Sequence, residues 1–163
     1  MAHNCIWQIE EVPENQYEEK GIELLNELML DFNDFPMRYV DGWSNCIKDP
    51  FEFNNLVSVL PKGMFKVDKD NMCLEYVERP KKYLERFVKQ IKKLSKEITE
   101  ENLTNGSNAD VKLWMTLQDN GYECLIYTQH DKLIYFHEWI LNVVTFNDIG
   151  DKFYLGGVLD YKS

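Results

Sequence analysis

The sequence predicts an α+β fold, in which an antiparallel β-meander in the C-terminal part packs against a long amphipathic helix and shorter N-terminal helices. Apolar residues recur at helical spacing over residues 83–98, and they alternate with polar residues beyond residue 110. Helical and strand patterns are largely segregated along the chain, which favours α+β over a parallel βαβ fold. With 163 residues, we expect one domain over 1–163, divided into a helix-rich part (1–98), a loop (99–109) and a β-rich part (110–163).

The N-terminal part is predicted to begin with a short strand over residues 5–9. Asn15 can cap a helix whose apolar stripe continues to Phe32. Residues 36–49 are predicted to be irregular, with a turn at Asp41-Gly42. Asp49-Pro50 is typical of a helix start and predicts a short helix over 50–60.

A hairpin and a long helix follow. The hairpin joins residues 64–67 and 72–77 through a polar turn. The helix begins at Pro80, and its apolar residues have i, i+3, i+4, i+7 spacing: Tyr83, Leu84, Phe87, Val88, Ile91, Leu94 and Ile98. We expect this face to be buried against the C-terminal sheet.

The C-terminal part is predicted to be a meander. Residues 111–117 and 122–128 flank the tight-turn signal Asn120-Gly121. Residues 133–146 are predicted to form one long strand or two shorter ones, and residues 152–161 a last strand after a turn at 147–151. The pair Gly156-Gly157 indicates a bulge or a close backbone approach.

Charge is distributed unevenly along the chain. The formal net charge is −10, of which residues 1–35 carry −8, residues 79–96 carry +7 and the other segments −9. An acidic protein repels phosphate, so direct nucleic-acid binding is not expected. Acidity instead favours a basic protein partner.

No known catalytic motif is present. The sequence lacks GxGxxG, GxxxxGK[ST], GxSxG and HExxH. His130, His137, Cys124 and Glu138 could form a thiol–histidine pair or a metal site, but nothing in their spacing fixes such a geometry. We therefore expect no catalytic residue, no metal and no cofactor.

The function favoured by these observations is a non-enzymatic acidic binding protein, in particular an immunity or antitoxin-type inhibitor that blocks a basic toxin such as a nuclease. Carboxylates would steer the partner and aromatic side chains would anchor it. The alternatives are a phage- or plasmid-type anti-defence protein that mimics nucleic acid, and an enzyme whose site the sequence does not display. The candidate partner-binding residues are Glu10, Glu11, Glu14, Glu18, Tyr39, Asp41 and Trp43.

The basic helix offers a second candidate surface. Its cations could grip phosphate or an acidic partner, or they could be the solvated face of an amphipathic helix. Eight bases with one acid is lopsided for a solvated face, which usually mixes both signs. The residues of this alternative basic face are Lys82, Arg86, Lys89 and Lys93.

The cysteines indicate a reducing compartment. Cys5, Cys46, Cys73 and Cys124 have wide, irregular spacings, and no secretory signal or long apolar segment is apparent. We expect a cytoplasmic protein that neither spans nor binds a membrane.

Thiol titration of the denatured protein without reductant should therefore count four free thiols, because nothing in this sequence directs the chain to an oxidising compartment. A count of two or fewer would contradict the cytoplasmic assignment.

Overall fold

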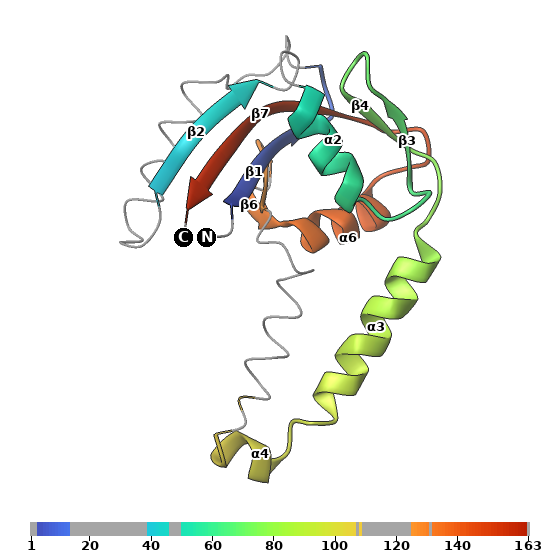
Figure 1. Ribbon diagram of the computed structural model, residues 1–163. Coiled ribbons are helices and arrows are strands. Elements are labelled where there is room, and N and C mark those ends of the chain that lie inside the picture. Colours follow the sequence, from blue (N-terminus) through green and yellow to red (C-terminus); the bar gives the residue numbers. More distant parts are fainter. Residues whose placement is uncertain are drawn as a thin grey trace.

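The computed structural model describes residues 3–13, 39–45, 50–106, 108, 125–130 and 132–162; for residues 3–4, 39–45, 132 and 160–162 it describes the backbone alone. Strands form a curved sheet, with helices α2 and α6 on its inner side and helix α3 extending away from it (Figure 1). The elements are β1 (His3–Glu10), β2 (Tyr39–Asn45), α2 (Pro50–Val59), β3 (Phe65–Asp68), β4 (Cys73–Tyr76), α3 (Lys81–Ser95), α4 (Glu100–Thr104), β5 (Leu125–Thr128), β6 (Lys132–Tyr135), α6 (Phe136–Phe146) and β7 (Lys152–Lys162).

The sheet is organised around β7. The described strands follow the order β3-β4-β7-β1-β5-β6, and β2 also pairs with β7. Strand β1 runs antiparallel along one edge of β7, from His3 opposite Lys162 to Glu10 opposite Tyr154. Strands β4 and β2 share its other edge, because β4 pairs with residues 152–154 and β2 with residues 157–162. Thus the last strand of the chain is the centre of the sheet.

The α+β class is confirmed, but the expected antiparallel meander is wrong in its topology. Strand β1 lies between β7 and β5 and is parallel to β5, with Ile6 opposite Leu125. The sheet is therefore mixed. A parallel pair needs no tight turn, so no local sequence signal marks it. Four of the described strands also lie within 1–98, the part expected to be helix-rich.

Strand β2 corrects the prediction that residues 36–49 are irregular. On β7, Tyr161 and Asp160 are consecutive, but their partners on β2 are Val40 and Gly42. Asp41 is therefore the extra residue of a β-bulge, which accommodates the Asp-Gly pair within a strand. The turn-like pair Asp41-Gly42 therefore marks an interruption of the β2–β7 pairing within a strand, and not the end of the strand.

Helix α6 corrects the strand prediction for residues 133–146. Only Lys132–Tyr135 is a strand, and the chain is helical from Phe136 to Phe146. The buried residues Phe136, Trp139, Ile140 and Val143 have i, i+3, i+4, i+7 spacing. The β-branched and aromatic residues of the segment favour a strand locally, but burial of this helical face decides the structure.

The main core lies between the sheet and the two helices α2 and α6. Phe53 and Leu56 of α2 join the α6 residues and side chains of β1, β4 and β7 in one buried cluster. Trp139 is at its centre: its ring stacks on Phe65 at 5.6 Å between centroids and meets the edge of Phe153 at 5.6 Å. Aromatic packing between α6 and the sheet thus holds the helix in place.

The glycine pair in β7 forms the expected bulge. Trp7 of β1 lies opposite Val158 and Ile9 opposite Leu155, so two residues of β7 face Gln8. The Gln8 side chain is buried, and its Oε1 accepts a hydrogen bond from the Gly157 backbone N–H at 3.2 Å. The Gln8 side chain therefore accepts a hydrogen bond from a backbone N–H that the bulge removes from the β1–β7 ladder.

Helix α3 does not pack as expected. Of its apolar face only Phe87 is buried; Ile91 and Leu94 are half-buried and Val88 is exposed. The Phe87 ring contacts His137 in the first turn of α6, with 5.6 Å between ring centroids. The helix extends beyond the end of α6, so the expectation that Phe87, Ile91 and Leu94 are all buried against the sheet is wrong (Figure 1). The expected loop over 99–109 also contains a short helix, α4.

Other predicted elements agree with the structure. The first strand, the helix over 50–60, the hairpin of β3 and β4, the strand ending at Thr128 and the last strand are confirmed. The helix expected from Asn15, the strand over 111–117 and the turn at Asn120-Gly121 lie outside the described residues. Neither Cys5 nor Cys73 is in a disulfide, while Cys46 and Cys124 are outside the description. Across the described ranges, no helix has the length and apolar character needed to cross a membrane.

Replacing Trp139 with Ala should destabilise the protein by about 3–5 kcal/mol, because it removes the aromatic centre of the core. Phe146→Ala is the matched control on the same helix, since that side chain is 80% exposed and its loss should cost about 0.5 kcal/mol or less. Urea denaturation measures both values. Equal losses for the two variants would contradict this placement of α6.

Candidate functional site

The carboxylates of Glu10 and Glu11 fasten the end of β1 to two other segments. Glu10 Oε1 accepts a hydrogen bond from the Gln129 backbone N–H at 2.6 Å, in the turn after β5. Glu11 Oε1 accepts one from Asn147 Nδ2 at 2.7 Å, at the end of α6. Both candidate residues therefore have structural partners, although Glu11 remains exposed.

The other acidic and aromatic candidates are not brought into a described site. Glu14 and Glu18 lie outside the described residues. Tyr39, Asp41 and Trp43 belong to β2, for which the structure describes the backbone and not the side chains. Their role as partner-binding residues stays a prediction.

A tightly bonded loop joins α6 to β7. Asp151 Oδ2 accepts hydrogen bonds from Asn147 Nδ2 at 3.2 Å and from the Asp148 backbone N–H at 2.9 Å. The Gly150 N–H donates to the Tyr76 carbonyl at 2.7 Å, and the Tyr76 N–H donates to the Asp151 carbonyl at 2.9 Å. Together with the Glu11–Asn147 bond, these contacts fix the loop between the ends of β1 and β4.

Exposed apolar side chains gather around this loop. The described residues contain seven large apolar side chains that are exposed, and four of them flank the bonded groups: Val12, Val77, Phe146 and Ile149. Phe146 is 80% exposed and Ile149 is 61% exposed. Single exposed apolar residues are ordinary, but their concentration around one ordered loop is typical of an interaction surface.

The same surface is acidic. Glu11, Glu78 and Asp148 are exposed and Asp151 is half-exposed within residues 11–12, 77–78 and 146–151, and the exposed cations Arg79 and Lys152 border these segments. We call the four apolar residues and these four acids the loop face. It combines carboxylates with an exposed aromatic, the combination expected of the partner-binding surface, at a place that the sequence analysis did not select.

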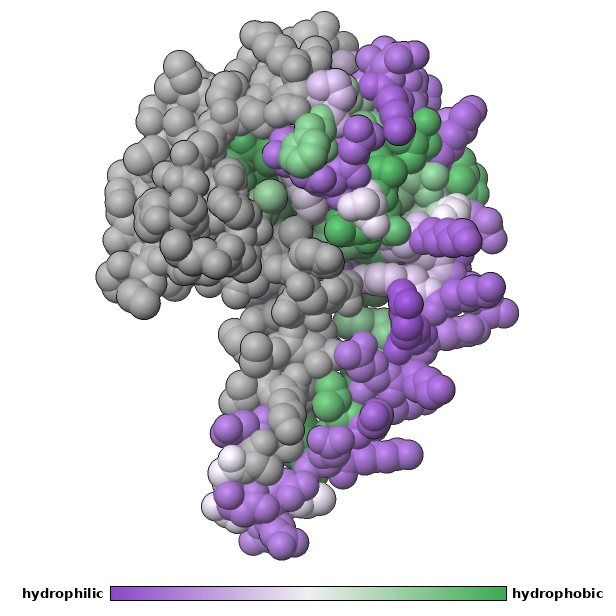
Figure 2. Space-filling view, viewed as in Figure 1, coloured by the Kyte–Doolittle hydropathy of each residue, from purple (hydrophilic) through white to green (hydrophobic). Residues whose placement is uncertain are grey.

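A second charged surface covers α3. Lys82, Arg86, Lys89 and Lys93 are exposed, as expected of the alternative basic face, and Arg79, Lys81, Lys92 and Lys96 are also exposed. We call residues 79–96 the basic arm. Figure 2 shows hydrophilic side chains along its outer edge. Among the described residues, its ion pair is Lys81 with Glu85, at 3.9 Å between Nζ and Oε1.

The groups considered for catalysis or metal binding are not assembled. His130 lies in the turn after β5, while His137 and Glu138 lie in the first turn of α6; Cys124 is outside the description. No group of three or more metal-ligating side chains occurs among the described residues. Burial raises the pKa of the Cys73 thiol, which disfavours the reactive thiolate.

Comparison with known proteins gives no identification: no protein-family model, curated protein or solved structure matches this chain.

The sequence contained one usable sign of the loop face. The turn at 147–151 was predicted, and the large apolar residues Phe146 and Ile149 lie beside and within it. Large apolar residues in a polar turn are a signal of exposure. The incorrect prediction of a strand over 133–146 masked this signal, because a strand would have placed Phe146 in the sheet.

Asn147→Ala should loosen the loop face, since the Asn147 amide donates to both Glu11 and Asp151. We expect a loss of about 0.5–1.5 kcal/mol of stability, the usual net value of a hydrogen bond, and faster amide hydrogen exchange at Asp148 and Gly150. Asn71→Ala, in the β3–β4 turn, is the control and should leave that exchange unchanged. Unaltered exchange in Asn147→Ala would contradict the bonding described.

Proposed function

We propose that this chain is a non-enzymatic binding protein that holds a basic protein partner on the loop face, in the manner of an immunity or antitoxin-type inhibitor. The observation that carries the proposal is the concentration of exposed apolar side chains and carboxylates around one loop that is fixed by hydrogen bonds. A basic partner would contribute Lys or Arg to the carboxylates and a pocket to Phe146.

The energetics of such a surface divide between two kinds of side chain. Carboxylates accelerate encounter with a positively charged partner, and salt weakens this attraction over about 8 Å at physiological strength. An aromatic anchor acts after docking, because separating the complex re-exposes its ring to water. Phe146, at 80% exposure, has most of its surface available for such burial.

Preorganisation supports the proposal. The loop backbone is bonded to β4 at Tyr76, and its side chains are bonded to Glu11 and to one another. A surface that is already ordered loses little conformational entropy on binding. Binding at the loop face therefore needs no rearrangement of this loop.

Overall charge also supports a basic partner. The whole chain carries −10 and residues 79–96 carry +7, so the remaining residues together carry −17. A basic protein is attracted at long range to a chain with this net charge. The nuclease identity of the partner stays a hypothesis; a nucleic-acid mimic or an enzyme gains no specific observation from the described residues.

The test compares variants in capture from native cells. Phe146→Ala and Asp148→Lys should each lose a basic partner that the wild-type chain retains. Asp148 is the acid of choice because its backbone N–H, and not its carboxylate, makes the described loop bond. Phe51→Ala is the control, an aromatic that is 65% exposed on α2.

Binding kinetics with the captured partner then separate the two roles. Asp148→Lys should slow association several-fold at low salt and less at high salt, whereas Phe146→Ala should raise the dissociation rate by tenfold or more, roughly the effect of losing 1.4 kcal/mol. Capture that is lost equally with Phe51→Ala, or that survives both loop-face variants, would refute the proposal.

A further inference from the structure

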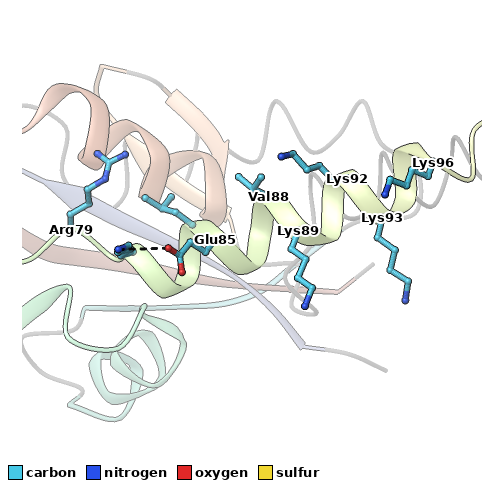
Figure 3. Close-up of a pocket in the computed structure, with 9 residues that line it drawn as sticks. Arg79, Glu85, Val88, Lys89, Lys92, Lys93 and Lys96 are labelled. Atoms are coloured by element: carbon cyan, nitrogen blue, oxygen red, sulfur yellow. Dashed lines mark ion pairs between the residues drawn. The ribbon is translucent and has the colours of Figure 1, made fainter.

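The basic arm carries a groove that is suited to an anionic ligand. The groove has a volume of about 780 Å³ and runs along α3, and the residues that line it are Arg79, Lys81, Leu84, Glu85, Val88, Lys89, Lys92, Lys93 and Lys96. Figure 3 shows the side chains of Lys89, Lys92, Lys93 and Lys96 extending from the part of the helix that follows Val88. Six of the nine lining residues are cations and one, Glu85, is an acid.

These cations are available to a ligand. Every Lys and Arg of the groove is exposed. Lys81 is paired with Glu85, but an ion pair on the solvated surface contributes little stability. Bringing so many like charges onto one helix costs stability through i,i+4 repulsion, as between Lys89 and Lys93 or Lys92 and Lys96. A bound anion relieves that cost.

The groove also has an apolar part. Val88 is 47% exposed and Leu84 is half-buried, and both line the groove among the lysines. The sugar–phosphate backbone of a nucleic acid offers no apolar side chain to such a position. A protein segment with a Leu or Val among carboxylates complements both features.

The arm's position permits anion binding by an otherwise acidic protein. A 15-residue helix is about 22 Å long, nearly three Debye lengths at physiological salt. Because α3 extends away from the sheet (Figure 1), the carboxylates of the loop face are largely screened at the distal lysines.

Acids limit the length of the ligand. Glu78 precedes the arm, and Glu97, Glu100 and Glu101 follow it; all four are exposed. A long polyanion such as duplex DNA, continuing past either end, would meet these carboxylates. A short acidic segment of about four helical turns matches the positive stretch alone.

We propose that the groove of the basic arm binds an acidic amphipathic segment of another protein, with carboxylates on Lys89, Lys92 and neighbouring cations and an apolar side chain on Val88. This site is separate from the loop face and does not depend on the function proposed for it.

The test uses fluorescence anisotropy of the full chain with a labelled 15-residue helical peptide that carries Glu in each turn and one Leu per turn. A second peptide has Gln in place of every Glu, and a third has Ser in place of every Leu. A single-stranded RNA of matched length and a DNA duplex are the nucleic-acid probes. Sedimentation velocity of the chain alone measures self-association.

We expect the Glu–Leu peptide to bind more tightly than all other probes, and more weakly as salt increases. Lys89→Glu combined with Lys92→Glu should weaken its binding by at least about tenfold, and Val88→Ser by roughly threefold. The control is Lys62→Glu combined with Lys66→Glu, which reverses two exposed lysines outside the arm and should leave binding unchanged. Circular dichroism establishes that each variant is folded.

Several results would overturn the proposal. Absence of peptide binding at roughly 100 μM would do so, as would equal binding of the Gln peptide or the Ser peptide. Tighter binding of RNA or DNA, lost in the double charge reversal, would assign the arm to nucleic acid. Self-association abolished by the same reversal would assign the groove to a second copy of this chain.

Discussion

The pairing of β7 with three strands is the constraint on which the rest of the structure depends. This eleven-residue strand pairs with β1 on one edge and with both β4 and β2 on the other. Two of these partners, β1 and β2, lie more than a hundred residues earlier in the chain. In long-range pairing of this kind, the chain loses the entropy of loop closure before the strand contacts contribute any stability. Once formed, it sets the register of β1 and thereby fixes where Glu10 and Glu11 leave the sheet.

The loop face follows directly from that register. Because β1 ends beside the start of β7, Glu11 reaches Asn147, and because β4 pairs with residues 152–154, Tyr76 meets the backbone of Gly150 and Asp151. The loop is therefore held by hydrogen bonds to the end of β1 and to the end of β4. The rigidity proposed for binding is a consequence of sheet topology and not of the loop sequence alone.

Local features were predictable from the sequence, and pairings were not. The hairpin of β3 and β4, helix α2 and the bulge at Gly156-Gly157 depend on turn residues and short-range spacing, which the sequence displays. The parallel contact of β1 with β5 depends on segments far apart in the chain. For α6, the β-branched composition competed with helical spacing, and burial of Trp139 against Phe65 and Phe153 decides for the helix. The sequence indicated acids as candidate binding residues, but it did not predict the hydrogen bonds of Glu10 and Glu11, because their partners are more than a hundred residues away in the chain.

The separation of charge between the two proposed surfaces has an electrostatic consequence for the orientation of a bound partner. The loop face and the basic arm adjoin at Glu78 and Arg79, so a basic partner that approaches the loop face is attracted on one side and repelled on the other. Screening confines this repulsion to about 8 Å, which leaves docking possible while disfavouring orientations that overlap the arm. A segment bound at Lys89 and Lys92 would lie about 15 Å along the helix from Arg79, which is nearly two Debye lengths at physiological salt. Charge alone would therefore couple the two surfaces only through the first turn of the arm, and an acidic segment in the groove would leave attraction at the loop face nearly unchanged.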